Sequence, residues 1–149
     1  MTGAAAIASY CIEDLSVGQS ASYSRKITEA DIQKFGEVSG DMNPLHFDEE
    51  YAKGTLFRGR IAHGMLSVSF LSTVFGTMLP GAGAIFMGGS VRFKAPVRIG
   101  DTVVATVKVR EIDLAKRRVT FDCFCNVGDT SVTDGEATLK VPTRAAQKG

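Results

Sequence analysis

A change in the spacing of apolar residues near residue 84 constrains the fold more than any other feature of the sequence. Before this point, Gly64–Met78 is apolar around nearly the whole circumference of a helix, with serine and glycine in the gaps, and such a helix is expected to be buried. After it, apolar and polar residues alternate with the period of a β-strand, and glycine–aspartate pairs mark turns. The expected strands are Ala84–Pro96, Thr102–Ile112, Arg118–Val127 and Ser131–Val141. Helices followed by strands predict an α+β domain in which a curved antiparallel sheet wraps around one buried helix.

The first part of the chain adds a strand and two further helices to this prediction. Gly18–Ile27 has the pattern of a turn followed by a strand. Thr28 then opens a helix with a capping box in which Asp31 stands in place of the usual glutamate, and Gly40 ends it. A short second helix is expected from Asp48, because the acidic residues that follow suit the positive end of a helix.

Length and composition describe an ordinary globular protein. The 149 residues form one domain, residues 1–149, with tails over about 1–9 and 144–149 that are expected to be loose. The net charge of +1, without a block of like charge, argues against nucleic acid or an acidic membrane as the main partner. No apolar run is long enough to cross a membrane, and the amino terminus is not a convincing secretion signal. A cytoplasmic location is therefore expected.

The cysteines favour a reducing compartment and carry no evident chemistry. There are three of them, an odd number. Cys123 and Cys125 lie two apart in a strand, so their side chains are expected on the same face. No second cysteine pair or nearby histidine completes a metal site. Packed, unreactive thiols are the favoured interpretation.

The segment from Asp41 to His46 is the strongest candidate for chemistry. It holds a carboxylate and an imidazole five positions apart in sequence, and such a pair can transfer protons near neutral pH. Pro44 stiffens the link and favours an extended Asn43, which could orient one of the two side chains. A purely structural turn is the alternative, because Asx-Pro pairs are common in turns. It is disfavoured because both side chains are present and a buried helix follows.

The second histidine precedes the buried helix. His63 has no acidic partner nearby in sequence, so a satisfied packing histidine is favoured over a proton carrier. Gly64 would have a free backbone N–H at the positive end of the helix if the helix begins there. The helix serines suit either substrate contact or simple spacing. Arg92, Lys94 and Arg98 suit either phosphate binding or solvation of a strand, and the sequence leaves both readings open.

Four segments of the chain belong together as a pattern. They are Asp41-Met42-Asn43-Pro44-Leu45-His46, Ala62-His63-Gly64-Met65-Leu66, the run from Phe86 to Val97, and Gly100-Asp101. In their order and spacing they resemble one known family, the MaoC-like (R)-specific enoyl-CoA hydratases of the hot-dog fold. The resemblance extends over roughly Leu15 to Pro142.

The resemblance implies a site and a reaction, the reversible hydration of a trans-2-enoyl-CoA to the (R)-3-hydroxyacyl-CoA. Asp41 and His46 would hold the water and move its protons, and the Gly64 N–H would stabilise the thioester oxyanion. The substrate-binding residues would be Asn43, Met65, Ser72 and Gly88. Coenzyme A would enter as part of the substrate, with no metal or other cofactor, and two subunits would pair as a homodimer.

Three alternatives remain open at the level of the sequence. Two are enzymes, a hot-dog acyl-CoA thioesterase and a dehydratase acting on an acyl-carrier-protein thioester. The third is a non-catalytic acyl-CoA-binding module, which would be expected to lack Asp41 or His46, and both are present.

Overall fold

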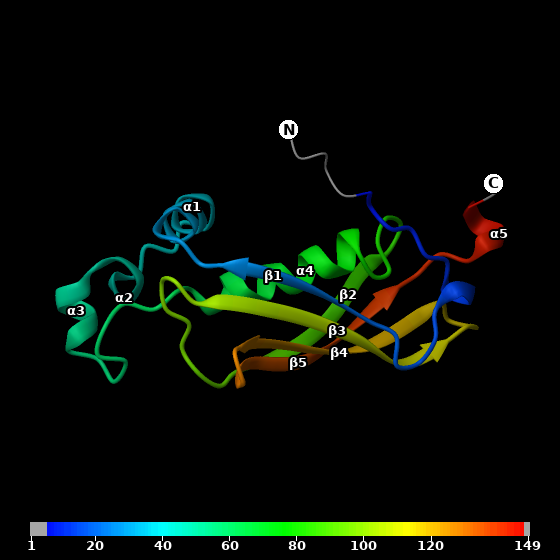
Figure 1. The fold of residues 1–149 in the computed structure, drawn as a ribbon. Coiled ribbons are helices and arrows are strands. Elements are labelled where there is room, and N and C mark those ends of the chain that lie inside the picture. Colours follow the sequence, from blue (N-terminus) through cyan, green and yellow to red (C-terminus); the bar gives the residue numbers. More distant parts are fainter. Residues whose placement is uncertain (1–5, 148–149) are drawn as a thin grey trace.

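One antiparallel sheet and one long helix form the core of the molecule. The computed structural model describes residues 6–147. Five strands are arranged in the order β1-β3-β4-β5-β2, with β1 and β2 at the two edges. Helix α4 lies along one face of this sheet (Figure 1). The strands are β1 (Ser20–Lys26), β2 (Ile85–Phe93), β3 (Thr102–Asp113), β4 (Arg118–Val127) and β5 (Thr130–Lys140).

The α+β prediction and the predicted strands are confirmed to within a few residues. Along β3 the alternation of residue types matches an alternation of burial, with Val103, Ala105 and Val107 fully buried. The main difference is at the end of β2, which stops at Phe93 instead of Pro96. There the backbone N–H groups of residues 94 and 95 share the carbonyl of residue 132, and Pro96 has no N–H to continue the ladder.

Helix α4 (Gly64–Thr77) supplies the core but is not buried on all sides, so the expectation of all-round burial is wrong for the single chain. One face packs on the sheet. The opposite face is open, with Met65 55% exposed and Ser72 also exposed. One sheet covers only one side of a helix, and the apolar residues on the other side are left to line cavities. The buried face consists of Leu66, Ser67, Phe70, Leu71, Val74 and Phe75.

Three helices gather at one end of the molecule, beyond the end of β1 (Figure 1). The capping box predicted at Thr28 is present, and Gly40 ends α1 in the left-handed region at φ 78°. An unpredicted single turn, α2, forms inside the signature segment, where Pro44 occupies the first helical position, to which its fixed φ is suited. The bounds are α1 (Glu29–Ser39), α2 (Pro44–Phe47) and α3 (Glu49–Lys53).

The described parts of both tails, which the sequence predicts to be loose, make hydrogen bonds and an ion pair to the rest of the domain. The backbone of Ala8 bonds to Thr77 and to Ala82, at 2.9 and 2.7 Å. A Cβ at Gly81 would lie 1.9 Å from the Ala8 carbonyl oxygen, so this contact requires a glycine. A short helix, α5 (Arg144–Gln147), follows β5, and Arg144 pairs with Asp14 next to the 3-10 helix η1 (Ile12–Asp14). Residues 1–5 and 148–149 of the expected tails lie outside the described part.

Within residues 6–147, no helix combines the length and the apolar character needed to span a bilayer.

Candidate active site

The signature segment folds as a closed turn. The Asp41 carboxylate accepts a hydrogen bond from the Asn43 N–H at 3.2 Å. The Asn43 side chain in turn accepts from the Leu45 N–H at 3.0 Å and caps α2. Asn43 therefore shapes the turn that carries His46, a role of the kind expected for it, although it acts through the backbone.

His46 is held in a defined protonation state and orientation. Its ring is buried, and Nδ1 lies 2.8 Å from the carbonyl oxygen of Ile61. A carbonyl only accepts, so Nδ1 carries the proton and Nε2 keeps its lone pair. Arg60 braces the same turn, because its Nε donates to the His46 carbonyl at 2.7 Å and its guanidinium pairs with Glu29 at 2.9 Å. The imidazole thus offers Nε2 as a proton acceptor.

The surroundings keep His46 uncharged near neutral pH. Burial is the main cause that lowers its pKa, and the neighbouring charges of His63 and Arg60 lower it further. The Ile61 carbonyl and the Asp41 carboxylate act in the opposite direction without reversing the shift. A neutral imidazole is the form that can take a proton from water.

The structure brings the two predicted proton-transfer groups together and places His63 beside them. One side-chain ligand atom each of Asp41, His46 and His63 lie within 4.8 Å of one another. Asp41 is exposed, whereas both histidines are buried. These groups are close enough for one small molecule such as water to lie between the Asp41 carboxylate and a histidine ring.

His63 is packed as expected but is only half satisfied. Its ring is stacked on His46, with ring centroids 3.9 Å apart and an angle of 29° between the planes. Its Nε2 lies 3.0 Å from the backbone carbonyl oxygen of Asp41. Its Nδ1 is buried and has no hydrogen-bond partner within residues 6–147. The prediction of a satisfied packing histidine is therefore wrong for one of the two ring nitrogens.

Three nearby ligand groups raise the question of a metal, and the ring geometry is unfavourable for one. A metal is bound in the plane of each imidazole at about 2 Å. The two rings are stacked, so their in-plane lone pairs run nearly side by side and cannot converge on one ion. Two of the four ring nitrogens also face backbone carbonyls. The expectation of a metal-free site stays a prediction.

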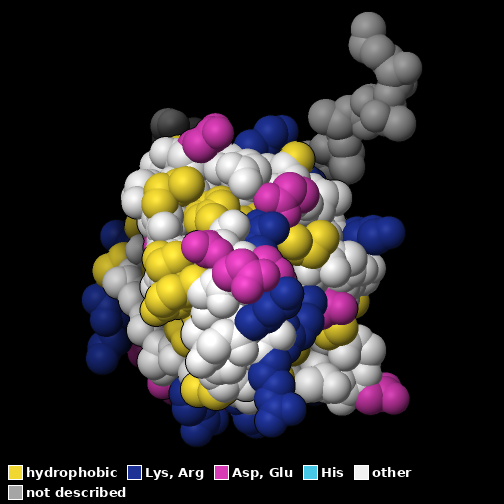
Figure 2. All heavy atoms as spheres, turned by 90° about the vertical axis from the view of Figure 1, so that its left-hand side faces the viewer, with side chains coloured by type: hydrophobic (Ala, Val, Ile, Leu, Met, Phe, Trp, Pro, Cys, Tyr) yellow, Lys and Arg dark blue, Asp and Glu magenta, His cyan; other side chains and the backbone are white. Residues whose placement is uncertain are grey.

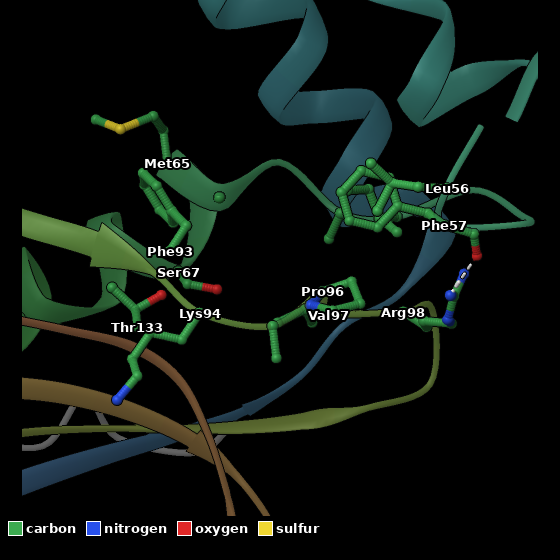
Figure 3. A pocket seen from close by; sticks show the side chains of 14 residues that line it. Leu56, Phe57, Met65, Ser67, Phe93, Lys94, Pro96, Val97, Arg98 and Thr133 are labelled. Atoms are coloured by element: carbon green, nitrogen blue, oxygen red, sulfur yellow. Dashed lines mark hydrogen bonds between the residues drawn. The ribbon is translucent and has the colours of Figure 1, made fainter.

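Gly64 begins α4, as the oxyanion hypothesis requires. Its N–H belongs to the first turn, and no acceptor for it is found within residues 6–147. The glycine lines a cavity of about 520 Å³, which we call the Gly64 cavity. In Figure 3, Met65 and Phe93 lie at one end of this cavity, and Leu56 and Phe57 lie at the other. The Phe93 ring lies so close that a Cβ on Gly64 would be 2.6 Å from it.

A second cavity, which we call the α4–β2 groove, lies between α4 and the strands β2 and β5. It has a volume of about 630 Å³ and is mostly apolar. Met65 lines both cavities, and Ser72 lines this one, so two of the predicted substrate-binding residues lie on its wall. Gly88 does not; it follows an irregularity in the β2–β5 register, and its neighbour Gly89 lines the groove instead.

The basic residues near the site divide into two groups. Lys94 and Arg98 line the Gly64 cavity, although Lys94 also pairs with Asp134 at 3.2 Å and Arg98 donates to the Phe57 carbonyl at 2.6 Å. Arg92 pairs with the same Asp134 at 3.0 Å, is largely exposed and does not line this cavity. Lys and Arg side chains also gather on the face of the molecule that carries α1, α2 and α3 (Figure 2). Lys94 and Arg98 are therefore the better candidates for phosphate contact.

A comparison with protein families decides the assignment. A family model described as the MaoC-like domain matches residues 15–130. The chain belongs to the MaoC-like domain family. One relative in this family, the (R)-specific enoyl-CoA hydratase of Rhodospirillum rubrum, is 54% identical over 132 residues, which cover 89% of this chain and 92% of the relative. A 3-hydroxybutyryl-CoA dehydratase of Methylorubrum extorquens is 45% identical over 89% of this chain and 84% of its own length.

Solved structures of two R-hydratases agree with the fold. The (R)-hydratase of A. caviae involved in PHA biosynthesis superimposes with a TM-score of 0.83 at 39% identity, over 87% of this chain and 99% of that chain. The unliganded R-hydratase PhaJ1 of Pseudomonas aeruginosa also gives 0.83, at 43% identity, over 90% and 86%. With the sheet order and α4 described above, these matches confirm the expected hot-dog fold.

Several supporting residues of this MaoC-like site were not predicted. Arg60 and the carbonyl of Ile61 both hold His46, yet they lie 14 and 15 positions from it in sequence. The contact between His63 and Asp41 spans 22 positions. No short motif signals such contacts. Arg60 and Glu29 lie 31 positions apart in sequence, so the sequence alone does not indicate that they form an ion pair.

Proposed function

We propose that this chain is an (R)-specific enoyl-CoA hydratase, a hydro-lyase that also runs in reverse as an (R)-3-hydroxyacyl-CoA dehydratase. The observation that carries the proposal is the pairing of an exposed Asp41 carboxylate with a buried, neutral His46 whose Nε2 lone pair is free of the Ile61 contact. The two relatives described above have the same or the reverse activity in their names.

One water molecule bridges Asp41 and His46 in the proposed reaction. As the water oxygen bonds to C3 of the enoyl thioester, one of its protons passes to the pair, with His46 Nε2 as an acceptor. The pair returns a proton to C2. All atoms of the water end in the product, as a hydroxyl on C3 and a hydrogen on C2, and both arrive from the same face of the alkene.

The backbone N–H of Gly64 stabilises the charge that builds on the thioester oxygen. It is the first amide of α4, where the helix dipole adds positive potential. Removing one such donor costs about 3 to 4 kcal/mol of transition-state stabilisation in other enzymes. Because Phe93 packs against Gly64, we expect this ring to shift or to form one wall of the thioester site.

The acyl chain and coenzyme A have separate places in this proposal. The mostly apolar α4–β2 groove, with Met65 and Ser72 on its wall, takes the acyl chain. The Gly64 cavity takes the thioester and the adjoining pantetheine arm, and Lys94 and Arg98 on its wall are the candidates for contact with the phosphates of coenzyme A. Coenzyme A belongs to the substrate, and acid–base groups with a backbone donor are sufficient for the chemistry, so no further cofactor is proposed.

A homodimer through β2 is part of the proposal. Strand β2 pairs with β5 on one side and forms an edge of the sheet on the other. Four of its large apolar side chains, those of Ile85, Phe86, Met87 and Phe93, are at least half exposed. An exposed apolar edge strand favours pairing with another strand, and a second copy of the chain offers the same edge.

A cytoplasmic location fits the thiols. Burial is the main cause that raises the pKa of Cys123 and of Cys125 to about 12, so both stay protonated and unreactive. No nucleic-acid or membrane partner is proposed.

Crotonyl-CoA distinguishes the proposed activity from its alternatives. Hydration removes the ultraviolet band of the conjugated enoyl thioester and releases no thiol, so we expect the band to decay while a thiol reagent gives no signal. Release of free coenzyme A at the same rate would indicate a thioesterase. A decay seen only with acyl-carrier-protein substrates would indicate the dehydratase alternative. Binding without either signal would indicate a non-catalytic module.

A further inference from the structure

We infer that His63 is a positioning residue that fixes the backbone of Asp41 and the ring of His46 in one arrangement. The inference rests on the proposed hydratase function and assigns a task to a side chain that the reaction itself does not use. The side chain is only 2% exposed and precedes Gly64 at the start of α4.

The hydrogen bond of His63 reaches the loop that carries Asp41. Nε2 lies 3.0 Å from the Asp41 carbonyl oxygen, and a carbonyl only accepts, so Nε2 is the protonated nitrogen. The other local bonds of Asp41 connect it to Ser39 and Asn43, its near neighbours in sequence. The bond from His63 is therefore the contact that ties this loop to a distant element, α4.

The ring of His63 also limits the movement of His46. The two imidazoles are stacked with centroids 3.9 Å apart, and the His63 ring also contacts Phe35 and Phe47, with centroid distances of 4.8 and 5.6 Å. Enclosed in this way, His63 forms a fixed surface for the His46 ring. His46 can then rotate little without losing the Ile61 bond.

A simple packing role does not account for a histidine here. Its Nδ1 is buried and has no hydrogen-bond partner within residues 6–147, which destabilises the fold. A phenylalanine would fill the same space among aromatic rings without that penalty. What phenylalanine lacks is the N–H that reaches Asp41.

The inference predicts that loss of this N–H lowers turnover more than substrate binding. The substrate cavities are not lined by His63, whereas small displacements of a reacting group are costly in rate. His63→Phe keeps the ring and removes the donor, and we expect kcat to fall by about 10- to 100-fold with KM changed by less than about threefold. His63→Gln keeps a donor of similar reach and should recover most of the loss. The inference is overturned if His63→Phe keeps kcat within twofold, or if both variants lose the same factor.

A double-mutant cycle separates an action through Asp41 from an action through Gly64. In an Asp41→Asn background, His63→Phe should lower kcat by less than about threefold, because the group it positions is already inactive. A full multiplication of the two losses would mean that His63 acts elsewhere, at the start of α4, and would overturn the inference.

The ring tautomer tests the same claim on the unmodified protein, so the test does not depend on variants that fold. Nitrogen NMR of the histidine rings should assign the His63 proton to Nε2, with Nδ1 unprotonated. A proton on Nδ1 would remove the bond to Asp41 and overturn the inference. An inactive wild-type enzyme with the expected tautomer would instead count against the proposed function alone. An active wild type with an unaffected His63→Phe variant would count against the inference alone.

Discussion

At the scale of single residues, the proposed chemistry depends on two side chains in different environments. Asp41 is exposed to solvent, whereas His46 is buried and bonded through Nδ1 to a carbonyl. The carboxylate can recruit and orient water, and the neutral imidazole can accept its proton. The different environments therefore suit the two groups to different tasks in the proposed reaction.

Removal of either proton-transfer group should abolish most of the activity. Asp41→Asn and His46→Gln keep the approximate shape of each side chain, and each should lower kcat by at least about 10²-fold. The double variant should lose far less than the product of the two single losses, because the residues act as a unit. Glu37→Gln is a matched control on the exposed face of α1 and should leave kcat unchanged. Near-normal turnover in either single variant would contradict the assignment.

The lowered pKa of His46 can be tested in the pH dependence of activity and of stability. The acidic limb of kcat/KM should have its midpoint below 6.5, the ordinary histidine value, because burial disfavours the charged ring. The contribution of His46 to the free energy of unfolding is complete above pH 6.5. It is lost as the pH falls through the lowered pKa, because over this range the unfolded chain binds more protons than the folded chain. Denaturant titrations across this range should show that loss in the wild type and a flatter dependence in His46→Gln. An acidic midpoint above 6.5 would contradict the account.

The sequence offered candidates for the reacting residues, whose roles stay a prediction, but not the residues that hold them in place. Asp41, His46 and Gly64 belong to short local patterns whose chemistry can be inferred from residue type. Arg60 and the half-satisfied bonding of His63 depend on contacts between distant segments. A pattern of residue types carries no information about such contacts until the fold brings the segments together.

At the scale of elements, the first turn of α4 is central to the proposed oxyanion site. Its glycine lies under the ring of Phe93, so a side chain there would meet that ring before it met a substrate. Strands β3, β4 and β5 were predicted well because burial on one face gives a clear alternation. The open face of α4 was not predicted, because apolar residues that line a cavity look the same in sequence as apolar residues in a core.

Substitutions at Gly64 should separate a steric effect from the loss of the N–H. Gly64→Ala should lower kcat because its Cβ displaces the Phe93 ring. In a Phe93→Ala background, where that ring is absent, Gly64→Ala should lower kcat by a smaller factor. Gly64→Pro removes the N–H at a helix position that tolerates proline, and should lower kcat by about 10²-fold or more in either background. An active Gly64→Pro enzyme would remove the oxyanion role from this residue.

At the scale of the whole molecule, the exposed apolar edge of β2 is the expected dimer interface. Sedimentation at micromolar concentration should give a homodimer. Met87→Lys places a charge on this edge and should shift the protein towards monomer with a loss of activity. Val38→Lys is the control, because Val38 is exposed and apolar but lies on α1. A fully active wild-type monomer would exclude the dimer, and equal effects of both substitutions would exclude β2 as its interface.

The stereochemistry of the product is the most direct test of the central claim, that Asp41 and His46 deliver one water to one face of an enoyl-CoA. Crotonyl-CoA is supplied together with NAD⁺ and a 3-hydroxyacyl-CoA dehydrogenase of known hand, and both the enoyl band and NADH are followed. The account predicts that the band decays with almost no NADH when the coupling enzyme is (S)-specific, and with NADH formation when it is (R)-specific. Strong NADH formation with the (S)-specific enzyme would contradict the proposed substrate orientation and the (R)-hydratase function.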